Sequence, residues 1–297
     1  MSVIIPTKNR PVDLVNTVRS LFQQTVTAHE LIIVDQTPGE ESVLATRRLY
    51  EEQEQDQRQL VYLHEPKISG ASMARNRAME VATGDIWLFL DDDVILEPDF
   101  IAALLETYKK YPAAAGVSGI ITNYHPPSLG FRVWSWLFAR GPFHDERQSI
   151  YWQANSRATT EAVPVQKFGA GLMSFRAPAI AQVRFDLNPC AFPAEDIDFC
   201  AQLAPGSLLL IAPRARLAHM KTPTARPSEH WLRREVRLSW YMYKRHWHTS
   251  FKNRLCFCWL QLGYGLAAAV VSLRRFSLSP WSSIFAGMNM ARSVEYR

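Results

Sequence analysis

The chain has 297 residues, of which 47% are hydrophobic and 21% are charged. This composition is enough for a large core, and it excludes a disordered or collagen-like chain. Four cysteines are too few for a disulfide scaffold, and they lack the paired spacing of a zinc site, so we expect reduced thiols. The formal net charge of +5 is compatible with an anionic substrate, nucleic acid or an anionic membrane as a partner.

The N-terminus passes directly from Met1 into an apolar run. It has no basic leader, no long apolar segment and no small-residue cleavage site, so it does not resemble a signal peptide. We therefore expect the first strand to begin at residue 2 and the chain to start in the cytosol.

Short apolar runs alternate with helical patterns from residue 1 to residue 121. The runs predict strands at 3–5, 31–34, 60–63, 86–90 and 116–121. Between them, the spacing of apolar side chains predicts helices at 11–24, 41–58, 69–82 and 97–110, the third with Ser69 as its N-cap. Strand–helix alternation with short connections predicts a parallel sheet that is covered by helices on both faces.

The segment 122–160 breaks this alternation. It contains two adjacent prolines and the aromatic residues Trp134, Trp136, Phe138 and Trp152. We interpret it as a long excursion whose aromatic side chains pack against the protein rather than form a sugar-binding platform. We expect the chain to return to the sheet region at 163–168. Short strands and a helix at 194–204 then complete that region.

Three consecutive carboxylates, Asp91, Asp92 and Asp93, follow the apolar run 86–90. Ligands of open α/β sheets bind beyond the carboxyl ends of the strands. A single acid here is explained as a helix cap, but three adjacent acids repel one another and are better explained by a bound cation. Carboxylate oxygens suit Mg²⁺ or Mn²⁺, which bridge phosphate oxygens, so the motif predicts a metal–phosphate site.

Two enzyme classes commonly have such an acidic motif after an apolar strand. One is the haloacid-dehalogenase type of phosphohydrolase, in which Asp91 would be the nucleophile. The other is the nucleotide-sugar glycosyltransferase. The phosphohydrolase motif normally opens its fold, whereas three strand–helix units precede it here, which favours the glycosyltransferase.

The flanking segments resemble the motifs of the family 2 glycosyltransferases, which have the GT-A fold. The similar segments are 2–11 (SVIIPTKNRP), 31–35 (LIIVD), 70–78 (GASMARNRA), 83–93 (TGDIWLFLDDD), 169–171 (GAG) and 194–198 (AEDID). They occur in order between residue 2 and about residue 220. Two positions depart from the family pattern: Lys8 replaces a frequent aromatic residue, and Ala194 replaces the more usual glycine.

This resemblance implies an α/β, GT-A-like (Rossmann-like) domain over residues 1–225, with a mostly parallel sheet flanked by helices. It implies an inverting transferase that moves a sugar from a nucleoside-diphosphate sugar to an acceptor hydroxyl. It also implies a group of residues that bind the nucleotide sugar, namely Pro6, Thr7, Arg10, Asp35, Arg75, Asn76, Asp91 and Asp92.

The resemblance further implies the remaining site residues. Asp91, Asp93 and His219 would hold the Mn²⁺ or Mg²⁺ ion, which neutralises the diphosphate leaving group; Lys221 is an alternative contact for the diphosphate. Asp196 would be the general base and Glu195 would position the substrate. One base without an enzyme nucleophile implies a single displacement. The acceptor and sugar pocket would contain Gly169, Ala170 and Gly171.

The last part of the chain, 226–297, has a different composition. Lysine, arginine, tryptophan and tyrosine are frequent in 228–254, and the run 255–273 has no formal charge. That run is barely long enough to span a bilayer, and cations lie on both sides of it, so it favours a helical appendage that lies at an anionic membrane surface. A helical subdomain packed on the catalytic domain is the alternative. Nucleic acid is disfavoured because no matching basic face is recognisable in 1–225.

A membrane-associating appendage predicts a cytoplasmic location at the inner face of the membrane and suggests a saccharide or lipid-linked acceptor. Two further alternatives remain. A nucleotidyltransferase would need a glycine-rich basic loop near the first strand, which residues 6–10 do not provide. A non-catalytic membrane adaptor would bind no nucleotide.

Overall fold

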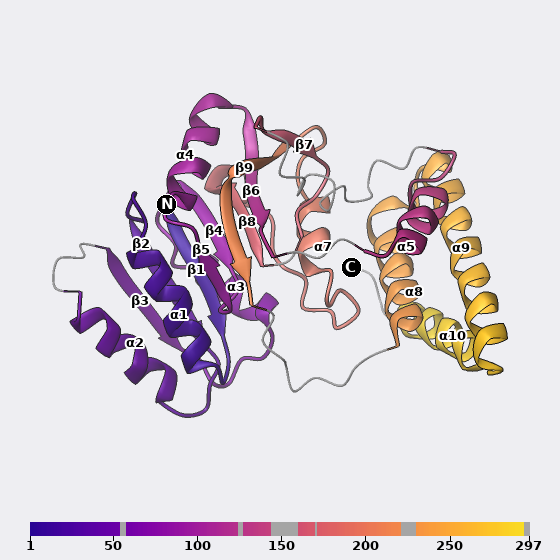
Figure 1. Ribbon diagram of the computed structural model, residues 1–297, viewed down its shortest axis with the longest axis horizontal. Helices are drawn as coiled ribbons and strands as arrows, with labels where there is room; N and C mark the ends of the chain where they lie inside the picture. Colours follow the sequence, from indigo (N-terminus) through magenta and orange to yellow (C-terminus); the bar gives the residue numbers. More distant parts are fainter. Residues whose placement is uncertain (54–57, 124–126, 144–159, 170, 221–229, 294–297) are drawn as a thin grey trace. The chain divides into compact units, whose positions relative to one another are not determined.

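The computed structural model describes residues 1–53, 58–123, 127–143, 160–169, 171–220 and 230–293 (Figure 1). The chain divides into two units. The sheet unit comprises Met1–His125, Ser149–Leu187 and Glu195–Pro223. The helical unit comprises Pro126–Gln148, Asn188–Ala194 and Thr224–Arg297.

The described residues of the sheet unit form one nine-stranded sheet in the order β3-β2-β1-β4-β8-β6-β9-β5, with β7 beside β9. The strands are β1 (Ser2–Thr7), β2 (Glu30–Asp35), β3 (Gln59–His64), β4 (Ile86–Leu90), β5 (Val94–Leu96), β6 (Ala114–Ile121), β7 (Val163–Val165), β8 (Leu172–Arg176) and β9 (Leu208–His219).

The expected parallel arrangement holds for β3, β2, β1 and β4, and the rest of the sheet is mixed. Strand β8 runs antiparallel to both β4 and β6. Strand β5 was not predicted, because it has three residues and follows the acidic turn without a break. It pairs antiparallel with β9 and aligns Val94 with His219. This register brings the end of β9 to the acidic turn.

Helices cover both faces of the sheet. They are α1 (Pro11–Phe22), α2 (Glu41–Glu51), α3 (Ala71–Met79), α4 (Phe100–Lys110) and α7 (Glu195–Ala201), with a short 3₁₀ helix, η2 (Ala177–Ile180). The predicted start of the third helix is wrong: its N-cap is Gly70, at φ +97°, rather than Ser69. A positive φ is inexpensive for glycine, so the chain turns sharply there before α3 begins.

Alternating side chains of the central strands divide the core into two layers. Val3 and Ile5 of β1 belong to the layer that includes α1 and α4, whereas Ile4 belongs to the layer that includes α3 and α7. This is the two-residue period of a strand with both faces buried. In the second layer the ring of Phe199 of α7 stacks on that of Phe185, with 4.3 Å between the ring centroids. It meets the ring of Phe89 of β4 edge-on, with 6.0 Å between the centroids. These contacts fix α7 against the sheet.

The described helices of the helical unit are α5 (Leu129–Trp134), η1 (Ser135–Arg140), α8 (Trp231–Met242), η3 (Tyr243–Trp247), α9 (Phe251–Arg275) and α10 (Ser279–Arg292). Their core contains Leu232, Val236, Tyr264, Ala268 and Ile284. Trp134 packs against Tyr264 and donates from Nε1 to the Gly263 carbonyl at 3.0 Å. This aromatic residue of the 122–160 segment therefore has a packing role, as expected; Trp152 lies outside the described residues.

Helix α9 is long and apolar enough to cross a membrane by length and composition, and 28% of its most apolar window is buried in the protein. The domain boundary that we predicted at residue 225 falls within 221–229, outside the described residues. The helical unit also includes two segments from earlier in the chain. The division at 225 stays a prediction.

Replacing Phe199 with alanine is expected to destabilise the sheet unit by roughly 3–5 kcal/mol, because it leaves a cavity in the aromatic layer. Phe199→Leu keeps most of the volume and is expected to cost substantially less. Urea denaturation of both variants measures the difference. An alanine variant that is as stable as the leucine variant would contradict this account of how α7 is held.

Candidate functional site

The acidic turn between β4 and β5 is the centre of the candidate site. The side chains of Asp92 and Asp93 are almost fully buried, and that of Asp91 is partly exposed. Burial raises the pKa of Asp92 to about 6; Thr7 and Arg10 oppose the rise, and the neighbouring Asp93 and Asp91 add to it. The turn therefore concentrates negative charge where water is scarce, which is unfavourable unless cations or donors compensate.

The end of β1 and the start of α1 supply part of that compensation. Thr7 donates from Oγ1 to Asp92 Oδ2 at 2.7 Å. Arg10 donates from Nη1 to Asp92 Oδ1 at 3.0 Å and lies 3.4 Å from Asp93 Oδ2. Thr17 of α1 donates from Oγ1 to the Asp92 carbonyl at 2.7 Å. Asp92 thus ties the acidic turn to the first strand and helix.

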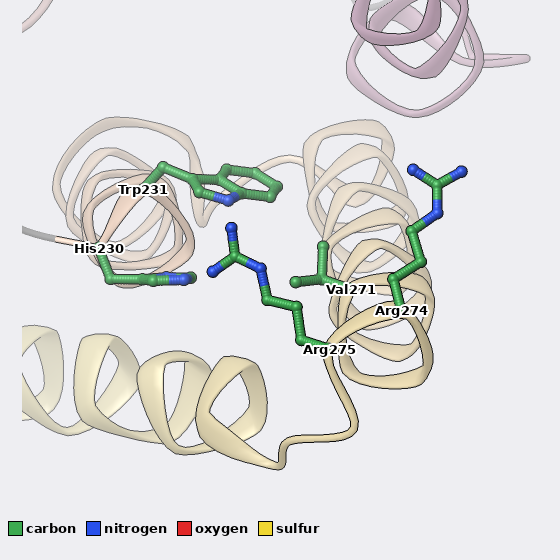
Figure 2. Close-up of a pocket in the computed structure, with 5 residues that line it drawn as sticks. All are labelled: His230, Trp231, Val271, Arg274 and Arg275. Atoms are coloured by element: carbon green, nitrogen blue, oxygen red, sulfur yellow. The ribbon is translucent and has the colours of Figure 1, made fainter.

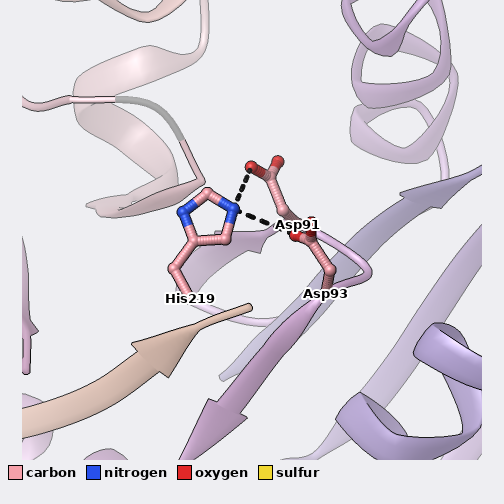
Figure 3. A group of neighbouring side chains, drawn as sticks. All are labelled: Asp91, Asp93 and His219. Atoms are coloured by element: carbon pink, nitrogen blue, oxygen red, sulfur yellow. Dashed lines mark ion pairs between the residues drawn. The ribbon is translucent and has the colours of Figure 1, made fainter. Parts of the chain in front are cut away.

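The other two acids of the turn lie beside the end of β9. His219 Nε2 is 3.0 Å from Asp93 Oδ1 and 3.8 Å from Asp91 Oδ2 (Figure 3). One possible ligand atom from each of the three residues lies within 4.8 Å of the others, and among the described residues this is the group that can hold a metal ion. Two carboxylates and an imidazole suit Mn²⁺ or a similar divalent ion. The residues present therefore fit the predicted metal.

Arg75 of α3 links the acidic turn to α7. Its side chain is 2% exposed and donates from Nη2 to Asp91 Oδ1 at 2.8 Å and from Nη1 to Glu195 Oε1 at 3.3 Å. Arg75 Nε and Glu195 Oε2 are buried and have no hydrogen-bond partner among the described residues. A buried guanidinium held by two carboxylates fixes both acids in position.

Asp196 follows Glu195 at the start of α7 and is buried as well. Burial, with a smaller contribution from the Glu195 charge, raises the pKa of Asp196 to about 7. Its Oδ1 accepts a hydrogen bond from the Ile197 backbone N–H at 2.7 Å. A carboxylate with a pKa near the working pH is well matched to a general base.

Asp35, at the end of β2, is completely buried. Its Oδ1 accepts from the Thr37 N–H and its Oδ2 accepts from the Tyr62 hydroxyl, both at 2.8 Å. Sequence reasoning missed Tyr62. The signal available was its place in the third strand, two residues before His64, which pairs with Asp35 and therefore shares a face of the sheet with Tyr62. Burial and the Asp35 carboxylate raise the pKa of Tyr62 well above its ordinary value, so it stays a donor. Pro6 lies in β1 in register with Val34.

Asn76 of α3 fixes the segment that precedes α7. Its Nδ2 donates to the Phe185 carbonyl and its Oδ1 accepts from the Phe185 N–H, both at 2.8 Å. The neighbouring Arg77 pairs with Glu65 and Glu80 at the surface, as a residue outside the site does. The side chain of Asn76 thus braces Phe185, and its role in nucleotide binding stays a prediction.

Gly171, directly before β8, lies against the acidic turn. It has a φ of +80°, and a β-carbon at this position would overlap the Asp91 carboxylate. Its carbonyl accepts from the Asp91 N–H at 3.3 Å. Gly169 has open space where a β-carbon would be. Of the other predicted residues, Ala170 and Lys221 lie outside the described residues.

Replacing Gly171 with alanine is expected to displace the Asp91 carboxylate and to weaken Mn²⁺ binding by about tenfold or more, a loss of ~1.4 kcal/mol. Gly169→Ala is the matched control, because its new methyl group meets no atom. Isothermal titration with Mn²⁺ measures both. Equal affinities in the two variants would contradict a role for Asp91 in holding the ion.

The chain is similar to several known proteins. The sequence model described as Glycosyl transferase family 2 matches residues 2–176. The succinoglycan biosynthesis protein ExoM of Rhizobium meliloti (strain 1021) is 30% identical over 230 residues, which is 76% of this chain and 68% of ExoM. The GalNAc(5)-diNAcBac-PP-undecaprenol beta-1,3-glucosyltransferase of Campylobacter jejuni is 28% identical over 106 residues, 36% of this chain and 33% of that protein.

Among solved structures, mannosyltransferase PcManGT from Pyrobaculum calidifontis, in complex with GDP-Man and Mn²⁺, is similar in fold. The TM-score is 0.60 with 16% sequence identity, over 98% of this chain and 86% of that chain. This likeness confirms the expected GT-A-like α/β fold with a helical C-terminal region. The phosphohydrolase and adaptor alternatives are not favoured. Because the family match covers more than half of the residues, the chain belongs to glycosyl transferase family 2 and is a glycosyltransferase.

Proposed function

We propose that this glycosyltransferase moves a sugar from a nucleoside-diphosphate sugar to the hydroxyl of a saccharide acceptor held at the membrane, with inversion at the anomeric carbon. The observation that carries the proposal is one connected network. It runs from the possible metal ligands Asp91 and Asp93 through Arg75 to Glu195, directly before Asp196. Charge stabilisation and proton transfer thus meet in one site.

Asp91, Asp93 and His219 would hold a divalent cation. When bound there, the cation would neutralise the negative charge of the diphosphate leaving group. The mixed carboxylate–imidazole donor set supports Mn²⁺ or Mg²⁺, and the similar PcManGT structure contains Mn²⁺ together with GDP-Man. Asp91 and Asp93 are then the two acids of an Asp-x-Asp motif.

The donor would be bound by the residues that surround the acidic turn at the ends of β1 and β2 and in α3. We assign Pro6, Thr7, Arg10, Asp35, Arg75, Asn76, Asp91 and Asp92 to this role. Arg10 and Arg75 already neutralise the carboxylates of the turn, so an incoming diphosphate meets less net negative charge. Gly169, Ala170 and Gly171 are assigned to the acceptor and sugar pocket.

Asp196 would take the proton from the acceptor hydroxyl while that oxygen attacks the anomeric carbon. The new glycosidic bond forms as the bond to the diphosphate oxygen breaks, and the proton ends on the Asp196 carboxylate. Glu195, held by Arg75, would position the substrate beside this base. One displacement by one acceptor inverts the anomeric configuration.

Helix α9 supports contact with a membrane surface. Its exposed apolar side chains recur on one face and are Phe251, Leu255, Leu262, Leu266, Val270 and Leu273. Residues 230–292 contain ten lysines and arginines against one acid, Glu235, a formal charge of +9. An apolar stripe with cations favours the surface of an anionic membrane. We assign residues 226–297 to this contact, at the inner face of the membrane.

The names of two relatives support a lipid-linked acceptor and polysaccharide biosynthesis, respectively. The Campylobacter jejuni relative is named for a PP-undecaprenol-linked acceptor, and ExoM is named for succinoglycan biosynthesis. The apolar stripe of α9 would keep the enzyme where a lipid-linked saccharide is held. We therefore favour a lipid-linked acceptor and polysaccharide biosynthesis.

Asp196→Asn is expected to reduce the rate of sugar transfer by about 10²-fold or more, while the affinity for the nucleotide is retained. The amide keeps the shape of the side chain but accepts no proton. Transfer is measured by release of nucleoside diphosphate, and binding by isothermal titration. Full transfer activity in this variant would refute the assignment of the base.

The pH dependence separates this role from a structural one. Since Asp196 must be ionised to act, kcat/KM of the wild type is expected to rise about tenfold per pH unit up to about pH 7 and then level off. The raised pKa also means that ionisation of Asp196 destabilises the fold as the pH rises toward 7. Asp196→Asn is therefore expected to be more stable than the wild type above pH 7, and not below pH 4.

The double variant Leu266→Ser/Val270→Ser is expected to bind anionic vesicles about tenfold more weakly, because it interrupts the apolar face of α9. Val12→Ser/Leu44→Ser changes two exposed apolar residues of the sheet unit and serves as the control. Vesicle co-sedimentation measures both. Equal binding by the two double variants would exclude α9 as the membrane contact.

A further inference from the structure

The helical unit contains a small pocket, and none of the residues that line it is assigned to catalysis. The pocket has a volume of about 340 Å³ and is lined by His230, Trp231, Val271, Arg274 and Arg275 (Figure 2). The start of α8 supplies the first two residues, and the last turns of α9 supply the other three. No lining residue is acidic, so the wall of the pocket contains two arginines and no carboxylate. In Figure 2 the Arg274 guanidinium extends in a different direction from that of Arg275.

The two arginines have no ion pair or hydrogen-bond partner among the described residues. Arginines in the last turn of a helix commonly complement its dipole. Here the backbone already caps α9, because the N–H groups of Phe276 and Ser277 both donate to the Ser272 carbonyl. Figure 2 shows the Arg275 guanidinium extending toward His230 and Trp231, away from its own helix. The helix dipole does not account for that direction.

Two further unsatisfied groups border the pocket. His230 Nδ1 is buried and has no hydrogen-bond partner within the described ranges. His230 is also the N-cap of the 12-residue helix α8, and its side chain makes no capping bond. The first N–H groups of α8 therefore add a positive end to the same pocket. The opposing partial charge at the end of α9 is only about half an elementary charge, against two full charges on the arginines.

Phosphate is the ligand that this arrangement matches. Guanidinium groups bind phosphate oxygens through two parallel N–H donors, and helix N-termini bind the same group. The pocket is larger than one phosphate group. Two apolar side chains come just after its last lining residue, Arg275: Phe276 is 98% exposed and Leu278 is 77% exposed. A phosphate carried by an apolar molecule would satisfy both parts of this surface.

We propose that His230, Arg274 and Arg275 bind the phosphate group of a membrane lipid, with Phe276 and Leu278 beside it at the acyl boundary. The phosphate site follows from the pocket alone. The lipid source of the phosphate rests on the membrane contact proposed above. The pocket would then orient the helical unit on the membrane, a task that a uniform layer of surface charge cannot perform.

The test uses the full chain and vesicles of phosphatidylcholine that contain either phosphatidic acid or oleate, adjusted to the same surface charge. The wild type is expected to bind the phosphatidic acid vesicles about tenfold more tightly, because only they offer an accessible phosphate monoester. Arg274→Gln/Arg275→Gln is expected to lose this preference. Lys252→Gln/Arg254→Gln removes two exposed cations from the other end of α9. This variant is expected to bind both types of vesicle more weakly but to keep the preference for phosphatidic acid.

A second arm omits vesicles and measures thermal stabilisation by inorganic phosphate against chloride at equal ionic strength. Stabilisation that is lost only in Arg274→Gln/Arg275→Gln supports the phosphate site. If phosphate stabilises the protein in this way but the wild type does not prefer phosphatidic acid vesicles, the pocket binds soluble phosphate and the proposal of a lipid ligand is refuted. Binding to both vesicle types alike, with no phosphate effect, would refute the pocket and leave the membrane contact standing. Circular dichroism of each variant checks that the fold is intact.

Discussion

Mutual repulsion among Asp91, Asp92 and Asp93 is the constraint on which the site depends. Two of these carboxylates are nearly buried at the end of a core strand, where each uncompensated charge is costly. Four residues from three parts of the chain compensate them. Arg10 and Thr7 come from the first strand and its exit, Arg75 from α3, and His219 from the end of β9.

The three carboxylates have different partners, and these partners give each acid a different role. Asp92 has a hydrogen bond from Thr7 and an ion pair with Arg10, so it serves as the tether of the turn. Asp91 and Asp93 share His219 and form the group that fits a metal ion. A divalent cation would complete the charge balance that the protein side chains leave open.

Arg75 extends this balance to α7, where it is shared between Asp91 and Glu195. Asp196 is buried and has no comparable ion pair with any residue that the structure describes. Burial, together with the Glu195 charge, raises its pKa to about 7. The surroundings thus separate a group that fits a metal ion from a carboxylate that can take up a proton. Neighbouring acids acquire different roles because their surroundings differ.

Local patterns were sufficient for the first half of the fold. Buried strands such as 31–34 and 86–90 are apolar runs between helical segments, and the structure extends them by no more than one residue at each end. The three-residue strand β5 left no such signal, and the antiparallel insertion of β8 depends on contacts distant in sequence. Ser69 matched the usual cap chemistry, but Gly70 provides the positive φ that the turn requires.

The motif residues were predictable one by one, whereas their partnerships were not. Arg75 and Glu195 are 120 positions apart, so no spacing rule connects them. Tyr62 bonds to Asp35 only because β2 and β3 pair in parallel register. The same limit applied to Trp134, whose packing against α9 places part of the 122–160 excursion in the helical unit.

The central claim is that the acidic turn binds a nucleoside diphosphate together with a divalent cation. Thermal unfolding with UDP, GDP, dTDP or CDP, each with and without Mn²⁺, tests it most directly, using the wild type and Asp93→Asn. One nucleotide with Mn²⁺ is expected to stabilise the wild type by ~3 kcal/mol at a hundredfold excess over its Kd. The asparagine variant is expected to lose that metal-dependent gain. No metal-dependent stabilisation of the wild type by any of the four nucleotides would contradict the account.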